Sequence, residues 1–147
     1  MTRFVGESRG QSLVETAIVL PLLLMLLIGI VDVGLSINAY LTVTNASREG
    51  VNYAIAHPSA APSQIASIVE QRIAPLHSVT TAASYYNGST FIPWPTSGIP
   101  SSSPSASQVP VRVQVSYPWS ASTILIGQFF GGTSRTFYGT STMTVTW

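Results

Sequence analysis

The sequence predicts an α+β fold in which one long N-terminal helix packs on a small antiparallel sheet. An aliphatic stretch near the N-terminus runs on into a two-faced helical pattern. The second half of the chain changes to the two-residue alternation that is typical of strands. Its 147 residues are enough for one domain with a modest core.

The first element is a helix long enough to span a membrane. Residues 16–31 carry no charge and are almost all aliphatic. Adding Ser12–Glu15 gives about 30 Å of helix, which matches the hydrocarbon thickness of a bilayer. We therefore expect a membrane span at about 12–32. The arginines Arg3 and Arg9 precede it, so the N-terminus is expected in the cytoplasm and the rest of the chain outside.

The same helix is predicted to continue past the membrane, so that one helix covers residues 11–57. His57-Pro58 ends it, because the residue before a proline disfavours the helical conformation. The pattern of its upper part is amphipathic. Its apolar stripe comprises Val33, Ile37, Leu41, Thr44, Val51 and Ile55, and the lower part of this stripe is expected to face lipid and the upper part to face the domain.

Residues 58–147 are predicted to form a small extracytoplasmic α+β domain. A short helix at 63–74, capped by Ser63, comes first. A strand at 79–86 then enters a tight turn at Asn87-Gly88, and Ser89 to Ile92 form its short partner.

The remaining elements are a loop, a connection and two strands. Prolines and serines predict an exposed loop at 93–108. The clearest strand is 109–117, where valines alternate with polar residues until Pro118 ends it. A short apolar helix or loop is expected at 121–130, and a last strand at 136–147. One face of the last strand carries Phe137, Met143, Val145 and Trp147.

The scarcity of charge limits the classes of function. Only 7% of residues are charged, whereas a soluble domain carries about 25%. A formal net charge of +1 gives no basic surface for nucleic acid. Cysteine is absent, and His57 and His77 lack the sequence context of a catalytic triad. We expect no enzyme activity, no metal or other cofactor, and an apolar surface covered by lipid or by other chains.

The most informative segment is the junction Arg9-Gly10-Gln11-Ser12-Leu13-Val14-Glu15. A short polar leader ends in Gly10, the aliphatic helix follows at once, and Glu15 is the fifth residue beyond the glycine. A secretory signal peptide is cut after its apolar stretch. A cut after Gly10 would instead remove residues 1–10 and leave the whole helix on the mature chain.

This junction resembles the prepilin processing site of type IV pilins, in which an aspartyl prepilin peptidase cuts after glycine and glutamate is the fifth mature residue. Gly10, Gln11 and Glu15 occupy the matching places. The segment that follows, V-E-T-A-I-V-L-P-L-L-L-M-L-L-I-G-I-V-D-V-G, is similar to the TadE-like proteins of the tight-adherence (Tad/Flp) pilus. The residues that match this pattern are Glu15, Pro21, Gly29, Asp32 and Gly34.

The resemblance implies a pilin-like fold. It also implies that the chain acts as a minor pilin or pilus-assembly subunit of a Tad/Flp-type pilus, and that this pilus serves in adhesion and biofilm formation. The implied partners are the prepilin peptidase, other pilin subunits and membrane lipid. The implied location is the inner membrane, crossed once with the C-terminal domain outside, and then the extracellular pilus. The alternative is an uncleaved bitopic anchor that acts in assembly. A domain freed by signal peptidase is disfavoured, because no small-residue cleavage site follows the apolar stretch.

Two charged residues border the predicted membrane span. After cleavage, Glu15 would lie one helical turn from the new amine of Gln11 and neutralise it, in its own subunit or a neighbour. Asp32 marks the outer membrane boundary, and pairing with Arg48 of a neighbouring subunit is its alternative role.

Proline and glycine are expected to shape the packing of the helix. Pro21 loosens or kinks it locally, because proline cannot donate the helical hydrogen bond. Gly29 and Gly34 permit close helix approach, although their spacing of five differs from the G-x-x-x-G pattern.

Overall fold

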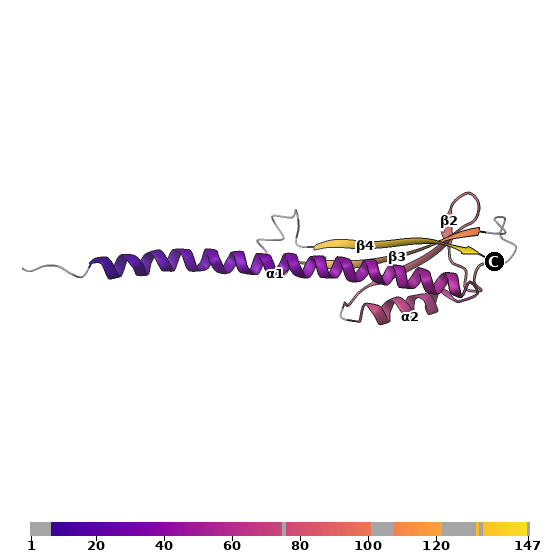
Figure 1. Ribbon diagram of the computed structural model, residues 1–147, viewed down its shortest axis with the longest axis horizontal. Coiled ribbons are helices and arrows are strands. Elements are labelled where there is room, and N and C mark those ends of the chain that lie inside the picture. Colours follow the sequence, from indigo (N-terminus) through magenta and orange to yellow (C-terminus); the bar gives the residue numbers. More distant parts are fainter. Residues whose placement is uncertain (1–6, 75, 101–107, 122–131, 133, 147) are drawn as a thin grey trace, which may run out of the picture. The chain divides into compact units, whose positions relative to one another are not determined.

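The computed structural model describes residues 7–74, 76–100, 108–121, 132 and 134–146. It has a long N-terminal apolar helix that packs against a four-stranded antiparallel sheet, which confirms the predicted α+β, pilin-like fold (Figure 1). The elements are α1 (Glu7–Ala56), α2 (Pro62–Arg72), β1 (Thr80–Tyr86), β2 (Phe91–Pro93), β3 (Gln108–Ser120) and β4 (Ser134–Thr146).

The chain divides into two compact units. One comprises residues 1–35 with 121–133, and the other comprises residues 36–120 with 134–147. α1 contributes its first part to one unit and its last part to the other. The predicted helix end is confirmed at Ala56, one residue before His57-Pro58. The helix starts earlier than expected, at Glu7, so that the last residues of the predicted leader are helical.

The sheet has the strand order β2-β1-β3-β4, and every neighbouring pair is antiparallel. β1 and β2 form a hairpin, in which Tyr86 pairs with Phe91. Asn87 holds its turn, because its Oδ1 accepts hydrogen bonds from the amides of Ser89 and Thr90 at 3.0 and 2.9 Å. The turn therefore has four residues, and the predicted hairpin is present.

The central strand β3 alternates as the sequence predicts. Val109, Val111, Val113 and Val115 are fully buried, whereas the intervening side chains are exposed or half-buried. The prediction that Pro118 ends the strand is wrong, because β3 continues to Ser120. β1 pairs only with Val111 to Ser116 of β3, so Pro118 lies where no β1 partner needs its missing N–H.

The helix face that packs on the sheet shares only the upper part of the predicted stripe, where Val51 is buried and Thr44 and Ile55 are half-buried. Val33, Ile37 and Leu41 are 40, 54 and 52% exposed. The sheet is instead covered by small residues at helical spacing, and these approach it closely. The buried residues of this helix face are Ala39, Val43, Ala46, Ser47, Gly50, Val51 and Ala54.

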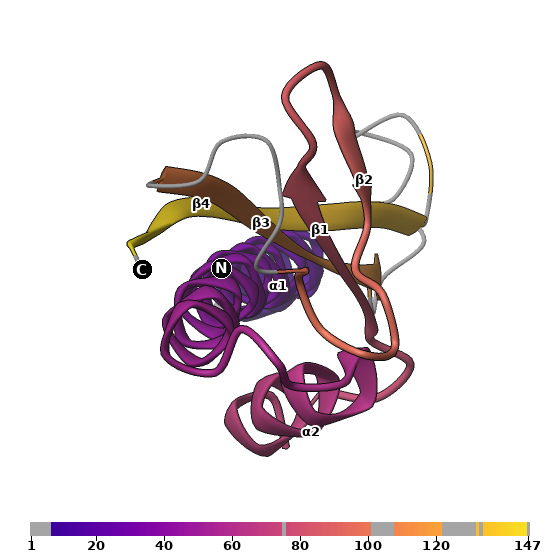
Figure 2. The same cartoon turned by 90° about the vertical axis from the view of Figure 1, so that its right-hand side faces the viewer.

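α2 lies on the same side of the sheet as the sheet-bearing part of α1, as Figure 2 shows. Its buried residues, Ile65 and Val69, belong to the predicted apolar stripe. The predicted cap is wrong. Ala61 occupies the N-cap, and its amide donates a hydrogen bond to Gln64 Oε1 at 2.9 Å, so Ser63 lies inside the helix.

The first part of the predicted loop 93–108 is packed rather than exposed. Trp94 and Ile99 are only 5 and 6% exposed. The Trp94 Nε1 donates a hydrogen bond to Ala60 O at 2.8 Å, and the Ile99 amide donates to Pro58 O at 2.8 Å. This segment therefore covers the turn after α1. The serine-rich residues 101–107 and most of the predicted apolar element 121–130 lie outside the described residues.

Candidate membrane helix and processing site

The predicted cleavage point lies on the surface of a helix. The Gly10–Gln11 bond is one helical turn inside α1, which begins at Glu7. Gly10 is exposed, and a Cβ built on it would meet no atom within 4 Å. A peptidase needs an extended substrate, so this first turn would have to open. Glycine makes that opening easier, because it costs a helix interior about 1 kcal/mol relative to alanine.

Glu15 is the only charged residue between Gly10 and Val31. Its side chain is exposed, and it lies one turn along the helix from Gln11. The neighbouring Thr16 satisfies its own hydroxyl by donating from Oγ1 to Ser12 O at 2.9 Å. In the intact chain Glu15 lies about two turns after Glu7, the first residue of α1, so only removal of residues 1–10 would bring it near a helix N-terminus, where the helix dipole favours negative charge.

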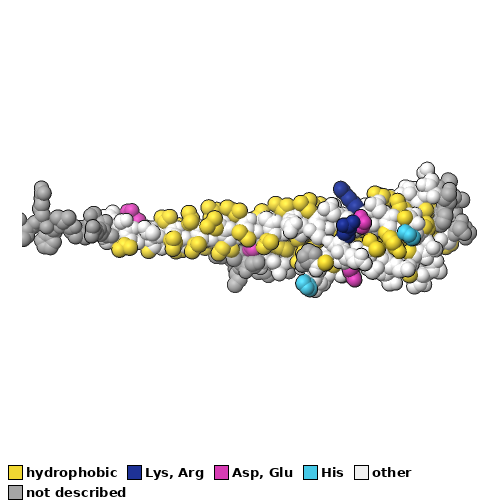
Figure 3. Space-filling view, turned by 60° about the horizontal axis from the view of Figure 1, so that its bottom comes forward, with side chains coloured by type: hydrophobic (Ala, Val, Ile, Leu, Met, Phe, Trp, Pro, Cys, Tyr) yellow, Lys and Arg dark blue, Asp and Glu magenta, His cyan; other side chains and the backbone are white. Residues whose placement is uncertain are grey.

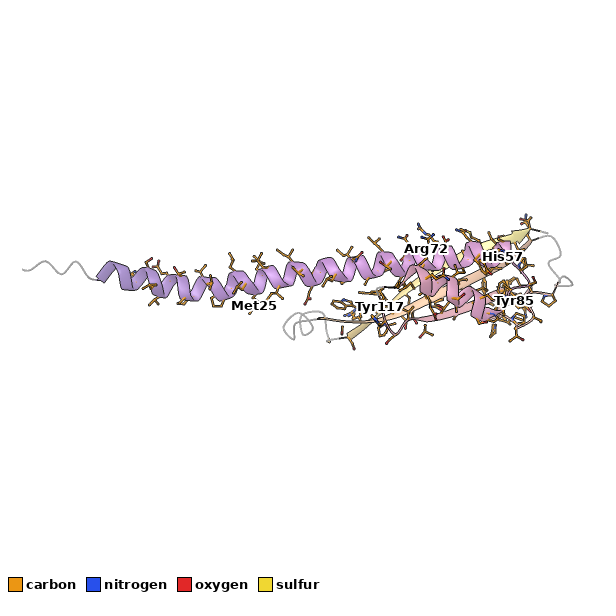
Figure 4. All side chains as sticks on the ribbon, turned by 90° about the horizontal axis from the view of Figure 1, so that it is seen from below. Met25, His57, Arg72, Tyr85 and Tyr117 are labelled. Atoms are coloured by element: carbon orange, nitrogen blue, oxygen red, sulfur yellow. The ribbon has the colours of Figure 1, made fainter. Side chains whose placement is uncertain are left out.

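The aliphatic side chains in the first part of α1 are exposed around the helix. Leu13 is 72% exposed, Leu26 is 64% exposed, and Met25 projects from the helix surface in Figure 4. The space-filling view shows hydrophobic side chains along this part of α1 (Figure 3). The 47-residue stretch Gly10–Ala56 contains an 18-residue window with a mean hydropathy of 2.7. By length and composition, this helix is able to cross a membrane.

The other predicted helix residues have different environments. Pro21 lies inside α1, which continues on both sides of it. Gly29 is half-buried, whereas Gly34 is exposed and has open space where a Cβ would stand. Asp32 is buried, with 2% exposure, and it has an interaction partner. Its role at the outer membrane boundary stays a prediction.

One ion pair of the sheet-bearing unit lies on its surface. Arg72 of α2 donates to Glu49 Oε1 of α1 at 3.2 Å, and the two side chains are 64 and 41% exposed. Arg72 and His57 are labelled in Figure 4. His57 stacks on Tyr53 with ring centroids 4.4 Å apart. The part of the chain that the structure describes contains no group of three histidine, aspartate or glutamate residues able to hold a metal ion.

Comparison with known protein families shows which family the N-terminal helix resembles. The family model described as TadE-like protein matches residues 10–52. This segment is TadE-like. The match associates the chain with the Tad pilus, and it begins at Gly10, the residue at the end of the predicted leader. Comparisons with curated proteins and with solved structures gave no match.

The TadE-like segment contains more than the residues that sequence reasoning selected. It covers Glu15, Pro21 and Asp32, and it also covers the buried small residues as far as Gly50. The spacing of Ala39, Val43, Ala46 and Gly50 by three or four is the signal that could have identified this face. The larger aliphatic residues nearby obscured it.

Proposed function

We propose that the chain is a minor pilin of a Tad/Flp-type pilus, cut after Gly10 by a prepilin peptidase and inserted into the filament through α1. The chain would first cross the inner membrane once, with its sheet-bearing unit outside. Glu15 would neutralise the new amine of Gln11. The TadE-like match over residues 10–52 supports a role with this pilus.

The observation that most supports filament packing is the extent of exposed apolar surface. Residues 12–32 already provide about 31 Å of helix, which is enough for the hydrocarbon core of a bilayer. Exposed apolar side chains nevertheless continue beyond Asp32. Leu35, Ile37 and Leu41 are 52, 54 and 52% exposed. Lipid would not cover these residues, whereas the helices of neighbouring subunits would.

An uncleaved bitopic anchor is the second candidate, and one observation favours it. α1 starts at Glu7, so the Gly10–Gln11 bond is helical. A helical bond is a poor substrate unless the first turn opens. In this role the chain would stay in the inner membrane and present its sheet to other assembly proteins.

Fractionation of cells that carry the matching pilus separates the two candidates. A minor pilin is expected in the sheared filament fraction, shortened by ten residues, with an unprocessed pool in the membrane. Leu41→Asn should remove it from filaments and leave the membrane pool intact, because the apolar contact is lost. Asn38→Ala, at an exposed polar position, is the matched control. Full-length chain found only in membranes would support the anchor instead.

A further inference from the structure

β4 is a long strand at the edge of the sheet. It extends over the 13 residues Ser134–Thr146, whereas strands in globular proteins have about five or six. All 13 residues pair with β3, and no described strand lies on the other side of β4. The hydrogen-bonding groups on that open side therefore decide what the edge can bind.

The register identifies the backbone groups that face outward. The Trp94 amide donates to Ala83 O at 3.0 Å, so the backbone of Ala83 faces β2 and that of Ser84 faces β3. Ser84 pairs with Arg112, whose backbone consequently faces β1. The alternate residue Val113 then faces β4. Carried across to β4, the same alternation turns the backbone groups of its even-numbered residues away from the sheet.

Two prolines support the same assignment independently. Pro110 pairs with Thr144, and Pro118 pairs with Thr136. Proline has no N–H, so a strand tolerates it where the pair exchanges no hydrogen bond. Both of these pairs are consequently of the non-hydrogen-bonded kind. Thr136 and Thr144 must therefore direct their backbone groups to the open side of β4.

The open edge is accessible and uncharged over most of its length. From Thr136 to Thr146 it contains no charged residue and no proline, the features by which natural edge strands avoid pairing with other chains. Every residue whose backbone faces outward also has an exposed side chain. These residues are Ser134, Thr136, Tyr138, Thr140, Thr142, Thr144 and Thr146.

We infer that the open edge of β4 binds an extended, uncharged segment of another protein by strand addition. Main-chain hydrogen bonds from the outward-facing residues would supply the binding energy. Hydroxyl-bearing or β-branched side chains on the added strand would pair best with the threonines. An acidic or basic residue opposite them would lose hydration without a partner, because β1 to β4 contain no acid and only Arg112 and Arg135 as bases.

A second copy of the chain fits this edge poorly. Two identical edges related by a two-fold axis pair antiparallel. β4 runs along the sheet-bearing part of α1 in Figure 1, so such pairing would point the two α1 helices in opposite directions. Two copies anchored in one membrane need them to point the same way. This exclusion rests on the proposed membrane anchoring, whereas strand addition itself does not.

Amide hydrogen exchange on the full chain in detergent micelles tests the inference. The probe is a synthetic peptide with the uncharged sequence of residues 136–146, TFYGTSTMTVT, which is not restrained by a membrane helix. In the free chain, the amides of Tyr138, Thr140 and Thr142 should exchange rapidly and that of Ser141 slowly. At nine-tenths occupancy by the peptide, the outward amides should slow about tenfold, because exchange then proceeds from the free tenth.

Matched proline variants test the assignment of the edge. Thr140→Pro should fold, as Pro110 and Pro118 do in β3, and should lose the peptide-induced protection. Ser141→Pro should disrupt pairing with β3. If Thr140→Pro fails to fold, a peptide N-methylated at alternate residues takes its place, and it should not protect the wild-type chain. Outward amides already slow in the free chain, or no protection by the unmodified peptide, would overturn the inference.

Discussion

Gly139 of β4 lies directly against the backbone of Val43 in α1. A Cβ built on Gly139 would be 2.5 Å from the Val43 carbonyl oxygen and 2.8 Å from its carbonyl carbon. Both obstructing atoms are backbone, so no side-chain rotation can relieve the overlap. At this point the distance between helix and sheet is set by the absence of a side chain.

Gly139→Ala is therefore expected to destabilise the sheet-bearing unit by about 1–3 kcal/mol, the usual cost of overpacking a core. Thermal unfolding in detergent, followed by circular dichroism, measures this loss of stability. Ser141→Ala, two residues along the same face, is the control and should change stability much less. Equal melting temperatures for Gly139→Ala and the wild type would show that the helix does not approach the sheet this closely.

Gly50→Ala should also destabilise the chain, but in a way that a second change can reverse. A Cβ on Gly50 would lie 2.7 Å from Val69 Cγ2 and 3.0 Å from Val113 Cγ1, which are side-chain atoms. The double variant Gly50→Ala/Val69→Ala should lose less stability than the sum of the single changes. Strict additivity in a double-mutant cycle would contradict this contact.

Trp94→Phe should cost about 1–3 kcal/mol, because it leaves the Ala60 carbonyl without the buried Nε1 donor at 2.8 Å. Trp119→Phe is the control, since Trp119 is half-buried and stacks on Phe137 through its ring. Chemical denaturation gives the loss in free energy of unfolding for both variants, provided that the dependence of this free energy on denaturant concentration matches that of the wild type. A loss for Trp119→Phe as large as that for Trp94→Phe would mean that ring volume matters rather than the hydrogen bond.

Arg72→Ala should change stability by no more than about 1 kcal/mol, even though it removes the Glu49 ion pair. Both side chains are largely solvated, so water replaces the interaction. The free energies of unfolding of Arg72→Ala and the wild type should converge as the salt concentration rises, because salt screens an exposed ion pair. A loss of several kcal/mol that persists in high salt would contradict this description of the surface.

The sequence predicted those elements whose pattern follows directly from burial. The alternation of Val109 to Val115 identified β3, and His57-Pro58 identified the end of α1, because both depend on local geometry. The packed face of α1 was predicted only in part, since Val51 is buried but Leu41 is exposed. The prediction relied on large aliphatic residues such as Leu41, whereas close contact with the sheet selects Gly50. That selection depends on the distance between two elements, which no local pattern records.

Long-range pairing explains the other differences between prediction and structure. Pro118 stays in β3 because β1 has already ended beside it, and Trp94 is buried because Ala60, far away in sequence, offers an acceptor. The prediction of the candidate processing site does not depend on long-range pairing. Gly10, Gln11 and Glu15 were selected because their junction resembles a prepilin processing site, a resemblance that lies in local sequence. Their role in cleavage stays a prediction.

The most direct test of the proposed function is the intact mass and N-terminal sequence of the full chain recovered from membranes that contain the prepilin peptidase. The proposal predicts a mature chain that starts at Gln11. It also predicts that Gly10→Ala blocks this cut, since alanine both alters the site and stiffens the first helical turn. A chain that keeps residues 1–10 beside an active peptidase, or one cut beyond Asp32, would contradict the proposal.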